Sequence, residues 1–296
     1  MSASGDRPAA WLRWGTAELD AAGVPSPRAD AETLLASALG VTRAEVRRLV
    51  VLDADLPEGR RADFARLVDR RAAREPLQHI LGAAPFRHLE LAVGPGVFVP
   101  RPETEVVAQV AIDEAERLAV DDARPLVVDL CCGAGGIALA VDTEVPASRV
   151  VAVDLAPEAV ALTRRNDAAV GTRTMRIEHG DVRDSELLAD LDGTVDVVVS
   201  NPPYIPPDAE PTEPEVRDHD PDLALYGGGV DGLDVPRAVV LASTRLLRAG
   251  GLFVMEHAEV QAAAVREVVT ASGAFDDAVT LDDLTGRPRA VVARRR

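Results

Sequence analysis

Five residues, SNPPY at positions 200–204, follow a valine-rich run at residues 195–199. They could hold a planar amide or amino nitrogen, because the side-chain oxygen of Asn201 and the backbone carbonyl of Pro202 can each accept one N–H. Consecutive prolines fix the backbone that carries this carbonyl, and the Tyr204 ring can lie against the planar group. Such a nitrogen is a weak nucleophile, so positioning would supply most of the rate of methyl transfer to it. The alternative is a strand end followed by an inert Pro-rich turn.

A glycine-rich turn at residues 131–136 follows the apolar run 126–130, and Asp154 ends the next apolar run. Glycines let a backbone approach a ligand closely, and a carboxylate at a strand end can accept both hydroxyls of a ribose. Asp181 and Val182 follow a third, weaker run and are placed to meet the edge of an adenine. These features predict a nucleoside ligand and fit NAD as well as S-adenosylmethionine. The alternative is that the glycines serve tight packing and Asp154 caps a helix.

The elements that must position these residues alternate between strand and helix. Apolar, Val-rich runs occur at 126–130, 150–153, 174–178, 195–199 and 251–255, with helical patterns between most of them. Near-continuous apolar strands that alternate with helices predict an α/β fold, a parallel sheet covered on both faces. Two further runs, 277–281 and 289–294, are expected to pair as an antiparallel edge.

The first part of the chain has a different pattern. Helical spacing of apolar residues covers 9–22, 27–39, 43–51 and 60–74. Ser26 is expected to cap the second of these helices, with Pro27 in its first turn and Gly40 after its end. Residues 83–99 alternate between apolar and polar and contain Gly-Pro turns, which predicts a short hairpin. We therefore expect three parts: a helical domain at 1–82, a β-hairpin linker at 83–100 and the α/β domain at 101–296.

Composition and charge narrow the classes of partner. The 296 residues carry a net charge of −17, and the whole excess lies in residues 101–296, which hold 19 Arg against 36 acids. Such an acidic chain is a poor match for duplex nucleic acid and favours a small molecule or a protein with basic patches as its partner.

No run of apolar residues is long enough to span a membrane, and the first residues lack the pattern of a signal peptide. The two cysteines are adjacent, so we expect a reduced, cytoplasmic setting and no disulfide framework. The five histidines show no metal-ligand spacing, so no metal is predicted.

These motifs together give the chain a resemblance to a known family over nearly its full length. AGVPSPRADAETLL, REPLQHILG, FVPRPETE, the glycine-rich turn and NPPY resemble the protein-glutamine N5-methyltransferases of the HemK/PrmC group. The resemblance implies a helical N-terminal domain joined by a hairpin to a Rossmann-like methyltransferase domain. It implies methyl transfer from S-adenosylmethionine, with S-adenosylhomocysteine as product, to the glutamine of the Gly-Gly-Gln motif in peptide chain release factors. The helical domain would help to grip the release factor.

The resemblance also implies roles for individual residues. Asn201 and the Pro202 carbonyl would bind the glutamine amide, and Pro203 and Tyr204 would shape its slot. The residues expected at the cofactor, from the resemblance and from the turn itself, are Gly133, Ala134, Gly135, Asp154, Asp181, Val182 and Asn201, with Phe98 and Arg101 near both cofactor and amide.

One position departs from the family, because Cys131 stands where the turn usually has its first glycine. We expect an unexceptional backbone there, since cysteine at positive φ would be strained by about 1 kcal/mol or more.

Thr104 and Glu105 are expected only to cap the helix after them, and Glu256 is expected to pair with His257. The acidic segment 205–235 is either a solvated loop or one that orders over a basic partner.

Three alternative functions remain open from the sequence. A ribosomal-protein glutamine methyltransferase would share the same motifs and differ in partner. An N6-adenine DNA methyltransferase would use the same NPPY chemistry, but it would need a DNA surface that this acidic chain does not suggest. A non-catalytic nucleotide-binding module is the alternative from another class.

Overall fold

The structure is a computed structural model that describes residues 7–57, 59–120, 124–171 and 174–296, so the first six residues of the predicted helical domain lie outside it. The chain forms two compact units. One contains Met1–Gly82 together with Pro211–His219, and the other contains Ala83–Glu210 and Asp220–Arg296. In the described residues, no helix is long and apolar enough to cross a membrane.

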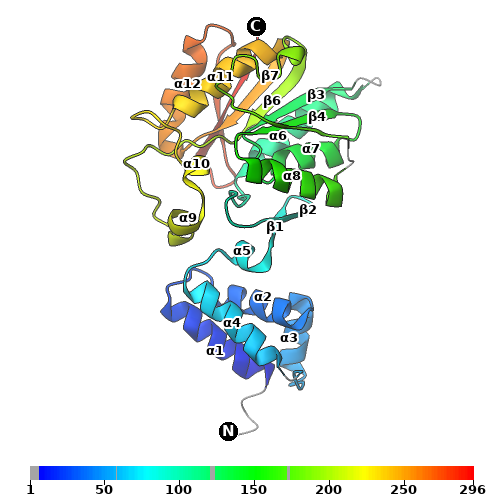
Figure 1. Cartoon of the computed structure of the whole chain (residues 1–296), viewed down its shortest axis with the longest axis vertical. Helices are drawn as coiled ribbons and strands as arrows, with labels where there is room; N and C mark the ends of the chain where they lie inside the picture. The colour runs from blue at the N-terminus through cyan, green and yellow to red at the C-terminus, as the bar shows by residue number, and fades with distance from the viewer. Residues whose placement is uncertain (1–6, 58, 121–123, 172–173) are drawn as a thin grey trace. The chain divides into compact units, whose positions relative to one another are not determined.

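The first unit is helical (Figure 1). Its helices are α1 (Pro8–Ala21), α2 (Pro27–Leu39), α3 (Arg43–Val51), α4 (Arg60–Ala72), α5 (Leu77–Leu81) and α9 (Pro214–His219). The apolar faces of α1 to α5 meet in one core, where Trp11 stacks on the fully buried Phe64 with 6.3 Å between ring centroids. Helix α2 starts with Pro27 and ends before Gly40 in the left-handed conformation, as predicted. The prediction for Ser26 was wrong, because its side chain makes no capping hydrogen bond.

The second unit is a seven-stranded sheet with a separate hairpin. The hairpin pairs β1 (Ala83–Phe86) with β2 (Leu89–Ala92), and the sheet order is β5-β4-β3-β6-β7-β9-β8. The strands are β3 (Leu126–Leu130), β4 (Arg149–Asp154), β5 (Arg176–His179), β6 (Val195–Ser200), β7 (Leu247–Glu256), β8 (Val279–Asp282) and β9 (Pro288–Arg294). The first five strands of this order are parallel, and β9 and β8 add an antiparallel edge, so the predicted α/β fold is confirmed.

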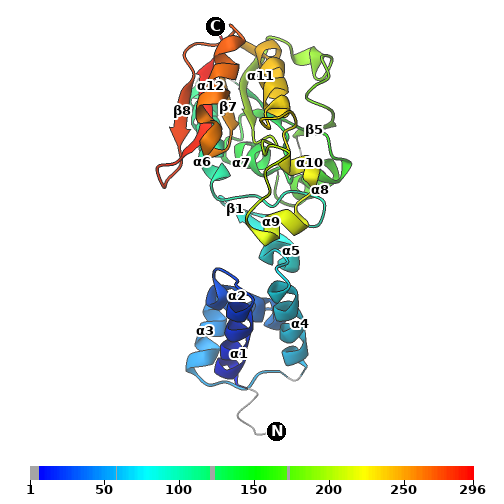
Figure 2. The same cartoon turned by 90° about the vertical axis from the view of Figure 1, so that its left-hand side faces the viewer.

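Helices cover both faces of this sheet (Figures 1 and 2). The helical elements are α6 (Thr104–Leu118), α7 (Gly136–Glu144), α8 (Pro157–Val170), η3 (Ala189–Leu191), α10 (Asp222–Leu225), α11 (Asp234–Leu246), η4 (Glu259–Gln261) and α12 (Ala262–Ala271). Helices α6 and α7 pack on one face, where Val127 and Val197 point, and α11 and α12 pack on the other, where Val128 and Val198 point. Successive strand residues thus feed two cores, which explains the nearly continuous apolar runs.

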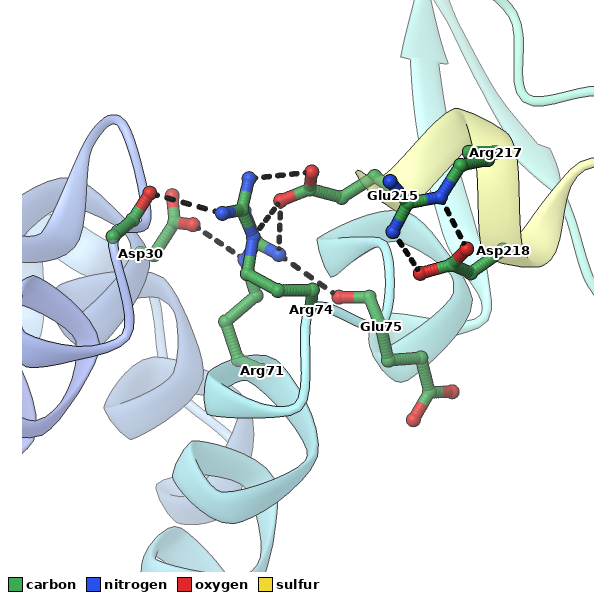
Figure 3. A network of polar contacts seen from close by, with 8 residues as sticks. Asp30, Arg71, Arg74, Glu75, Glu215, Arg217 and Asp218 are labelled. Carbon is green, nitrogen blue, oxygen red and sulfur yellow. Dashed lines mark hydrogen bonds and ion pairs between the residues drawn. The ribbon is translucent and has the colours of Figure 1, made fainter. Parts of the chain in front are cut away.

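An ion-pair cluster fixes the short helix α9 within the helical unit (Figure 3). Both Arg71 and Arg74 donate to Glu215, with nitrogen-to-oxygen distances of 2.7–2.8 Å. Arg71 also donates to Asp30 on α2 at 2.8 Å, and its side chain is only 7% exposed. The acidic segment after NPPY therefore leaves the sheet unit after Glu210, contributes α9 to the helical unit and returns at Asp220.

This cluster makes a testable prediction for Glu215. Glu215→Gln removes the charge that balances two arginines, so we expect α9 to be less stable on the helical unit by about 2 kcal/mol. Burial favours the neutral acid, but hydrogen bonds from Arg74 and Arg71 outweigh it and lower the pKa of Glu215 to about 2. The stabilisation is therefore fully present above pH 4.5, the ordinary value, and is lost as the pH falls through about 2.

Hydrogen exchange of peptides covering residues 211–219 measures this effect. At pH 7 and pH 5 we expect exchange about 30-fold faster in Glu215→Gln than in the wild type. The matched control is Glu213→Gln, which removes an exposed acid from the same segment. Equal protection in the two variants would contradict the assignment.

Candidate active site

The strand register brings the sequence-predicted residues to one edge of the sheet. Leu130 of β3 lies opposite both Val153 of β4 and Ser200 of β6, and Ser200 lies opposite Met255 of β7. The residues that follow these positions are therefore neighbours along the carboxyl edge: Asp154, Cys131, Asn201 and Glu256. The Ser200 hydroxyl donates to the Leu130 carbonyl at 2.6 Å and ties β6 to the start of the glycine-rich turn.

The glycine-rich turn packs tightly between β3 and α7. Gly133 and Gly135 have φ angles of 57° and 84°. A Cβ atom on Gly135 would lie 2.9 Å from a methyl carbon of Thr163 on α8, so the predicted close packing is present as well as the left-handed backbone. The Gly133 N–H donates to Asp154 at 2.8 Å rather than facing outward, and the buried Ala134 accepts from Asn166 through its carbonyl.

The expectation for Cys131 was wrong. Its φ is 63°, so this cysteine occupies the left-handed region that the usual glycine adopts without strain. The turn geometry imposes this conformation, because Cys132 donates its N–H to the Val153 carbonyl and Gly135 donates back to Cys132. Burial raises the pKa of the Cys131 thiol far above its ordinary value, which argues against thiolate chemistry there.

Burial raises the pKa of two carboxyls near the ends of β4 and β3, those of Asp154 and Asp129. Asp154 accepts from the N–H groups of Gly133 and Ala156, each at 2.8 Å and each on a different oxygen. Burial raises the pKa of Asp154, and these donors oppose the rise. Each oxygen keeps a lone pair for a ligand hydroxyl. Asp129 accepts from the Ala138 N–H, and burial raises the pKa of Asp129 to about 8.

The acidic residue after β5 is held by its neighbour. Arg183 contacts both carboxylate oxygens of Asp181 at 2.7–3.1 Å, and this bonding lowers the pKa of Asp181. Val182 is partly buried against the core under α11 and α12. The Gly180 N–H donates to the Asp154 carbonyl at 3.0 Å, which joins the two segments predicted to contact the nucleoside.

The NPPY segment is immobilised by contacts from several elements. Gln261 of η4 donates to the Tyr204 carbonyl at 2.8 Å, and Ile205 pairs with Tyr226 in a β-bridge. A Cβ on Gly227 would lie 2.7 Å from the Pro203 carbonyl oxygen, and one on Gly232 would lie 2.3 Å from the Tyr204 carbonyl oxygen. Only glycine allows this backbone-on-backbone contact, so the Gly-rich stretch after α10 serves to hold the NPPY segment.

Two polar side chains, Thr104 and Glu256, contact Asn201 and Tyr204. The Asn201 amide nitrogen donates to the Thr104 hydroxyl at 3.2 Å, and the Tyr204 hydroxyl donates to Glu256 at 3.4 Å. The Thr104 hydroxyl also interacts with Glu256 and lowers the pKa of that carboxyl. Burial dominates, however, and raises the pKa of Glu256 to about 7.

The roles expected for Thr104, Glu105 and Glu256 were therefore incomplete or wrong. Thr104 is the first residue of α6 and makes no capping bond, while Glu105 accepts from the backbone of Arg87. Glu256 contacts Tyr204 and Thr104, and His257 bonds instead to the Ala258 carbonyl. The signal in the sequence was present, because Thr104 lies in PRPETE and Glu256 ends a strand.

The PRPETE segment also positions the other two residues predicted near the site. The guanidinium carbon of Arg101 lies 5.0 Å from the centroid of the Phe98 ring, which is a cation–π distance. Arg101 donates to the fully buried side chain of Asp220 at 2.8 Å. Val97 and Val99, on either side of Phe98, pack against Ala134 and Ala159. The segment is thus fixed to both the glycine-rich turn and the end of the acidic loop.

The residues present fit an adenosyl ligand with a methyl-donating group. Asp154 offers acceptors for ribose hydroxyls, its carboxylate joins the glycine-rich turn to the end of β4, and Asn201 lies one strand away at the same edge. Among the described residues, no group of three or more His, Cys, Asp or Glu side chains could hold a metal ion.

Comparison with known families agrees with this architecture. Residues 10–82 match the family described as PrmC N-terminal domain, and residues 102–213 match the methyltransferase small domain.

Individual relatives extend the similarity over almost the whole chain. A release factor glutamine methyltransferase from Streptomyces coelicolor is 51% identical over 284 residues, which is 95% of each chain. One from Bifidobacterium longum is 45% identical over 289 residues, 95% of this chain and 97% of the relative. Among solved structures, the T. thermophilus 16S rRNA N2 G1207 methyltransferase, in complex with AdoMet and guanosine, aligns with a TM-score of 0.51 at 21% identity. The alignment covers 72% of this chain and 50% of that methyltransferase, and it supports the fold alone.

The left-handed backbone at Cys131 leads to a prediction about stability. Cys131→Gly and Cys131→Ala both remove the thiol, but only glycine relieves the strain at φ 63°. We expect the glycine variant to be more stable than the alanine variant by about 1 kcal/mol. Chemical unfolding with both variants side by side measures this difference. Equal midpoints and slopes would show that the position carries no strain.

Proposed function

Because this chain belongs to the release factor glutamine methyltransferase family, we propose that it methylates the side-chain amide nitrogen of the glutamine in the Gly-Gly-Gln motif of peptide chain release factors. The observation that carries the proposal is the placement of Asn201 beside Cys131 and Asp154 at one sheet edge. An amide-binding side chain thus lies next to a turn suited to a nucleoside. The chain is a methyltransferase, and its methyl donor is S-adenosylmethionine.

The protein's main contribution is to position the target nitrogen. The Asn201 side-chain oxygen and the Pro202 carbonyl accept the two N–H bonds of the glutamine amide, and the rigid Pro-Pro backbone prevents that carbonyl from turning away. Pro203 and Tyr204 shape the slot, and the contacts of Gly227 and Gly232 hold it in place. An amide that is held in line with the donor needs no strong base before transfer, because the excess proton can leave to water afterwards.

The cofactor is held by the neighbouring strand ends. Asp154 binds the ribose hydroxyls, Asp181 and Val182 face the adenine, and Gly133, Ala134 and Gly135 line the path between them. When bound, S-adenosylmethionine supplies a methyl group on a positively charged sulfur and leaves as S-adenosylhomocysteine. Phe98, Arg101 and Asn201 flank the point where donor and amide meet.

The domains divide the work. The helical domain at 1–82 recognises the release factor, the hairpin at 83–100 links the parts, and residues 101–296 carry the transfer chemistry. The partner is a protein, and we expect no binding of duplex nucleic acid by this acidic chain. We expect the enzyme to act in the cytoplasm, where release factors work.

The central experiment measures transfer of labelled methyl from S-adenosylmethionine to a purified release factor. We expect label on the Gly-Gly-Gln glutamine with the wild type. Asn201→Ala should lower kcat/KM by about 100-fold, because one of the two groups that orient the amide is lost, while the Kd for S-adenosylmethionine changes little. If the wild type binds the cofactor but labels a ribosomal protein or DNA instead, the proposed substrate is wrong.

A second variant separates cofactor binding from amide binding. Asp154→Asn should weaken S-adenosylmethionine binding by about 10-fold to 100-fold, since it loses charge-assisted hydrogen bonds to the ribose. Glu267→Gln, at an exposed acid on α12, is the matched control and should leave the Kd unchanged. Calorimetric titration with the cofactor measures both, and an unchanged Kd in Asp154→Asn would remove Asp154 from the site.

A further inference from the structure

Thr104 and Glu256 form a buried polar chain behind Asn201. Thr104 is 5% exposed and Glu256 is 2% exposed. Thr104 accepts a hydrogen bond from the Asn201 amide nitrogen at 3.2 Å. Its hydroxyl also interacts with Glu256 and lowers the pKa of that carboxyl. Neither residue lies in the NPPY motif, and both come from elements distant in sequence, the start of α6 and the end of β7.

The chemistry of these groups determines which of them donates and which accepts each hydrogen bond. An ionised carboxylate can only accept hydrogen bonds, and a hydroxyl has a single hydrogen to donate. Once Thr104 gives its hydrogen to Glu256, its oxygen can only accept from Asn201. The NH2 group of Asn201 must therefore face Thr104, so its side-chain oxygen is presented on the other side. The orientation of the Asn201 amide thus follows from the donors and acceptors around it.

We propose that Thr104 and Glu256 are positioning residues that hold the Asn201 amide in one orientation, and that they thereby make the site select glutamine over glutamate. The inference rests on the proposed function, because it assumes that Asn201 receives a side-chain amide. A glutamine NH2 group donates to the Asn201 oxygen. A glutamate carboxylate at the same place offers only acceptors and meets that oxygen without a hydrogen bond.

The charged groups around Glu256 set the pH at which this arrangement holds. Tyr204 donates to it, Arg289 of β9 attracts it, and Glu103 before α6 repels it. Its Oε2 atom is buried and has no hydrogen bond of ordinary length within the described ranges, so it has room for the Thr104 hydrogen. Because burial raises the pKa of Glu256 to about 7, the tests are made at pH 8.5, well above that value, where the ionised form predominates.

The first test examines the free enzyme and does not depend on any substrate. The chain contains only two asparagines, Asn166 and Asn201, so 15N labelling of asparagine side chains gives two NH2 signal pairs. Asn201→Ala assigns them by removing one pair. We expect Thr104→Val to speed hydrogen exchange of the Asn201 pair about tenfold, through loss of one hydrogen bond.

Two comparisons make this test specific. Asn166 donates to the carbonyls of Ala92 and Ala134, so its signals are an internal reference that should not change. Thr104→Ser keeps the hydroxyl and should behave as the wild type. If Thr104→Val leaves the Asn201 signals and their exchange unchanged, Thr104 does not hold the amide and the proposal is overturned.

The second test measures selectivity. Binding of a full-length release factor is compared with binding of its variant in which the Gly-Gly-Gln glutamine is replaced by glutamate, both with S-adenosylhomocysteine present. We expect the wild-type enzyme to prefer the glutamine form, and Thr104→Val to reduce that preference about tenfold, because Asn201 can then turn its NH2 toward a carboxylate. If Thr104 had a purely structural role, Thr104→Val would weaken binding of the glutamine and glutamate forms equally. An unchanged ratio of the two affinities would overturn the proposal.

Further variants test Thr104 and Glu256 separately. Thr104→Ser should retain the full preference. Glu256→Gln can donate as well as accept, so it should loosen the orientation and reduce the preference several-fold; an unchanged ratio would remove Glu256 from the proposal. If the wild-type enzyme neither binds nor methylates the release factor, the proposed function fails, whereas the NMR comparison still decides whether Thr104 orients Asn201.

Discussion

The parallel pairing of β4, β3, β6 and β7 brings the ends of four strands to one edge of the sheet. Because the register is fixed at Leu130, Ser200 and Met255, each residue that follows these positions has a set neighbour. A slip by one residue would reverse which side chains face each core and would separate Asn201 from Cys131 and Glu256. The two valine-rich cores on opposite faces of the sheet oppose such a slip, so the packing of the sheet interior determines the geometry of the site.

Burial at this edge creates a second requirement, because polar groups there must satisfy one another. Asp154 takes its donors from the backbone of the glycine-rich turn, Thr104 lies between Asn201 and Glu256, and Arg101 contacts Asp220. Each of these contacts joins segments distant in sequence. These contacts hold the side chains of the candidate site in place, which is what catalysis by positioning demands.

The sequence was sufficient for features set by local pattern and insufficient for those set by tertiary contact. The strands, the antiparallel edge and helices α1 to α4 followed from periodicity, whereas the short helices α5 and α9 were not predicted. The strand-end positions of Asp154 and Asn201 followed from the strands. The left-handed Cys131 did not, because the turn enforces a conformation that the residue type disfavours. The Thr104–Asn201 contact and the Arg74–Glu215 ion pair span 97 and 141 positions, so no local pattern reports them.

Electrostatics separates the buried carboxyls at the sheet edge from those in ion pairs elsewhere in the fold. Burial raises the pKa of Asp129 to about 8 and of Glu256 to about 7, so their contribution to stability is full below their ordinary values near 4 and is lost as pH rises through 7 and 8. Glu114 and Glu215 behave in the opposite way. Burial disfavours their charge, but bonds from Arg117 and Arg294, and from Arg74 and Arg71, lower their pKa to about 2, so they stabilise the fold throughout the neutral range. The sheet edge thus keeps carboxyls that cost stability at neutral pH, whereas ion pairs elsewhere in the chain add stability there. This separation is expected where a site needs acceptors held in a fixed, poorly solvated arrangement.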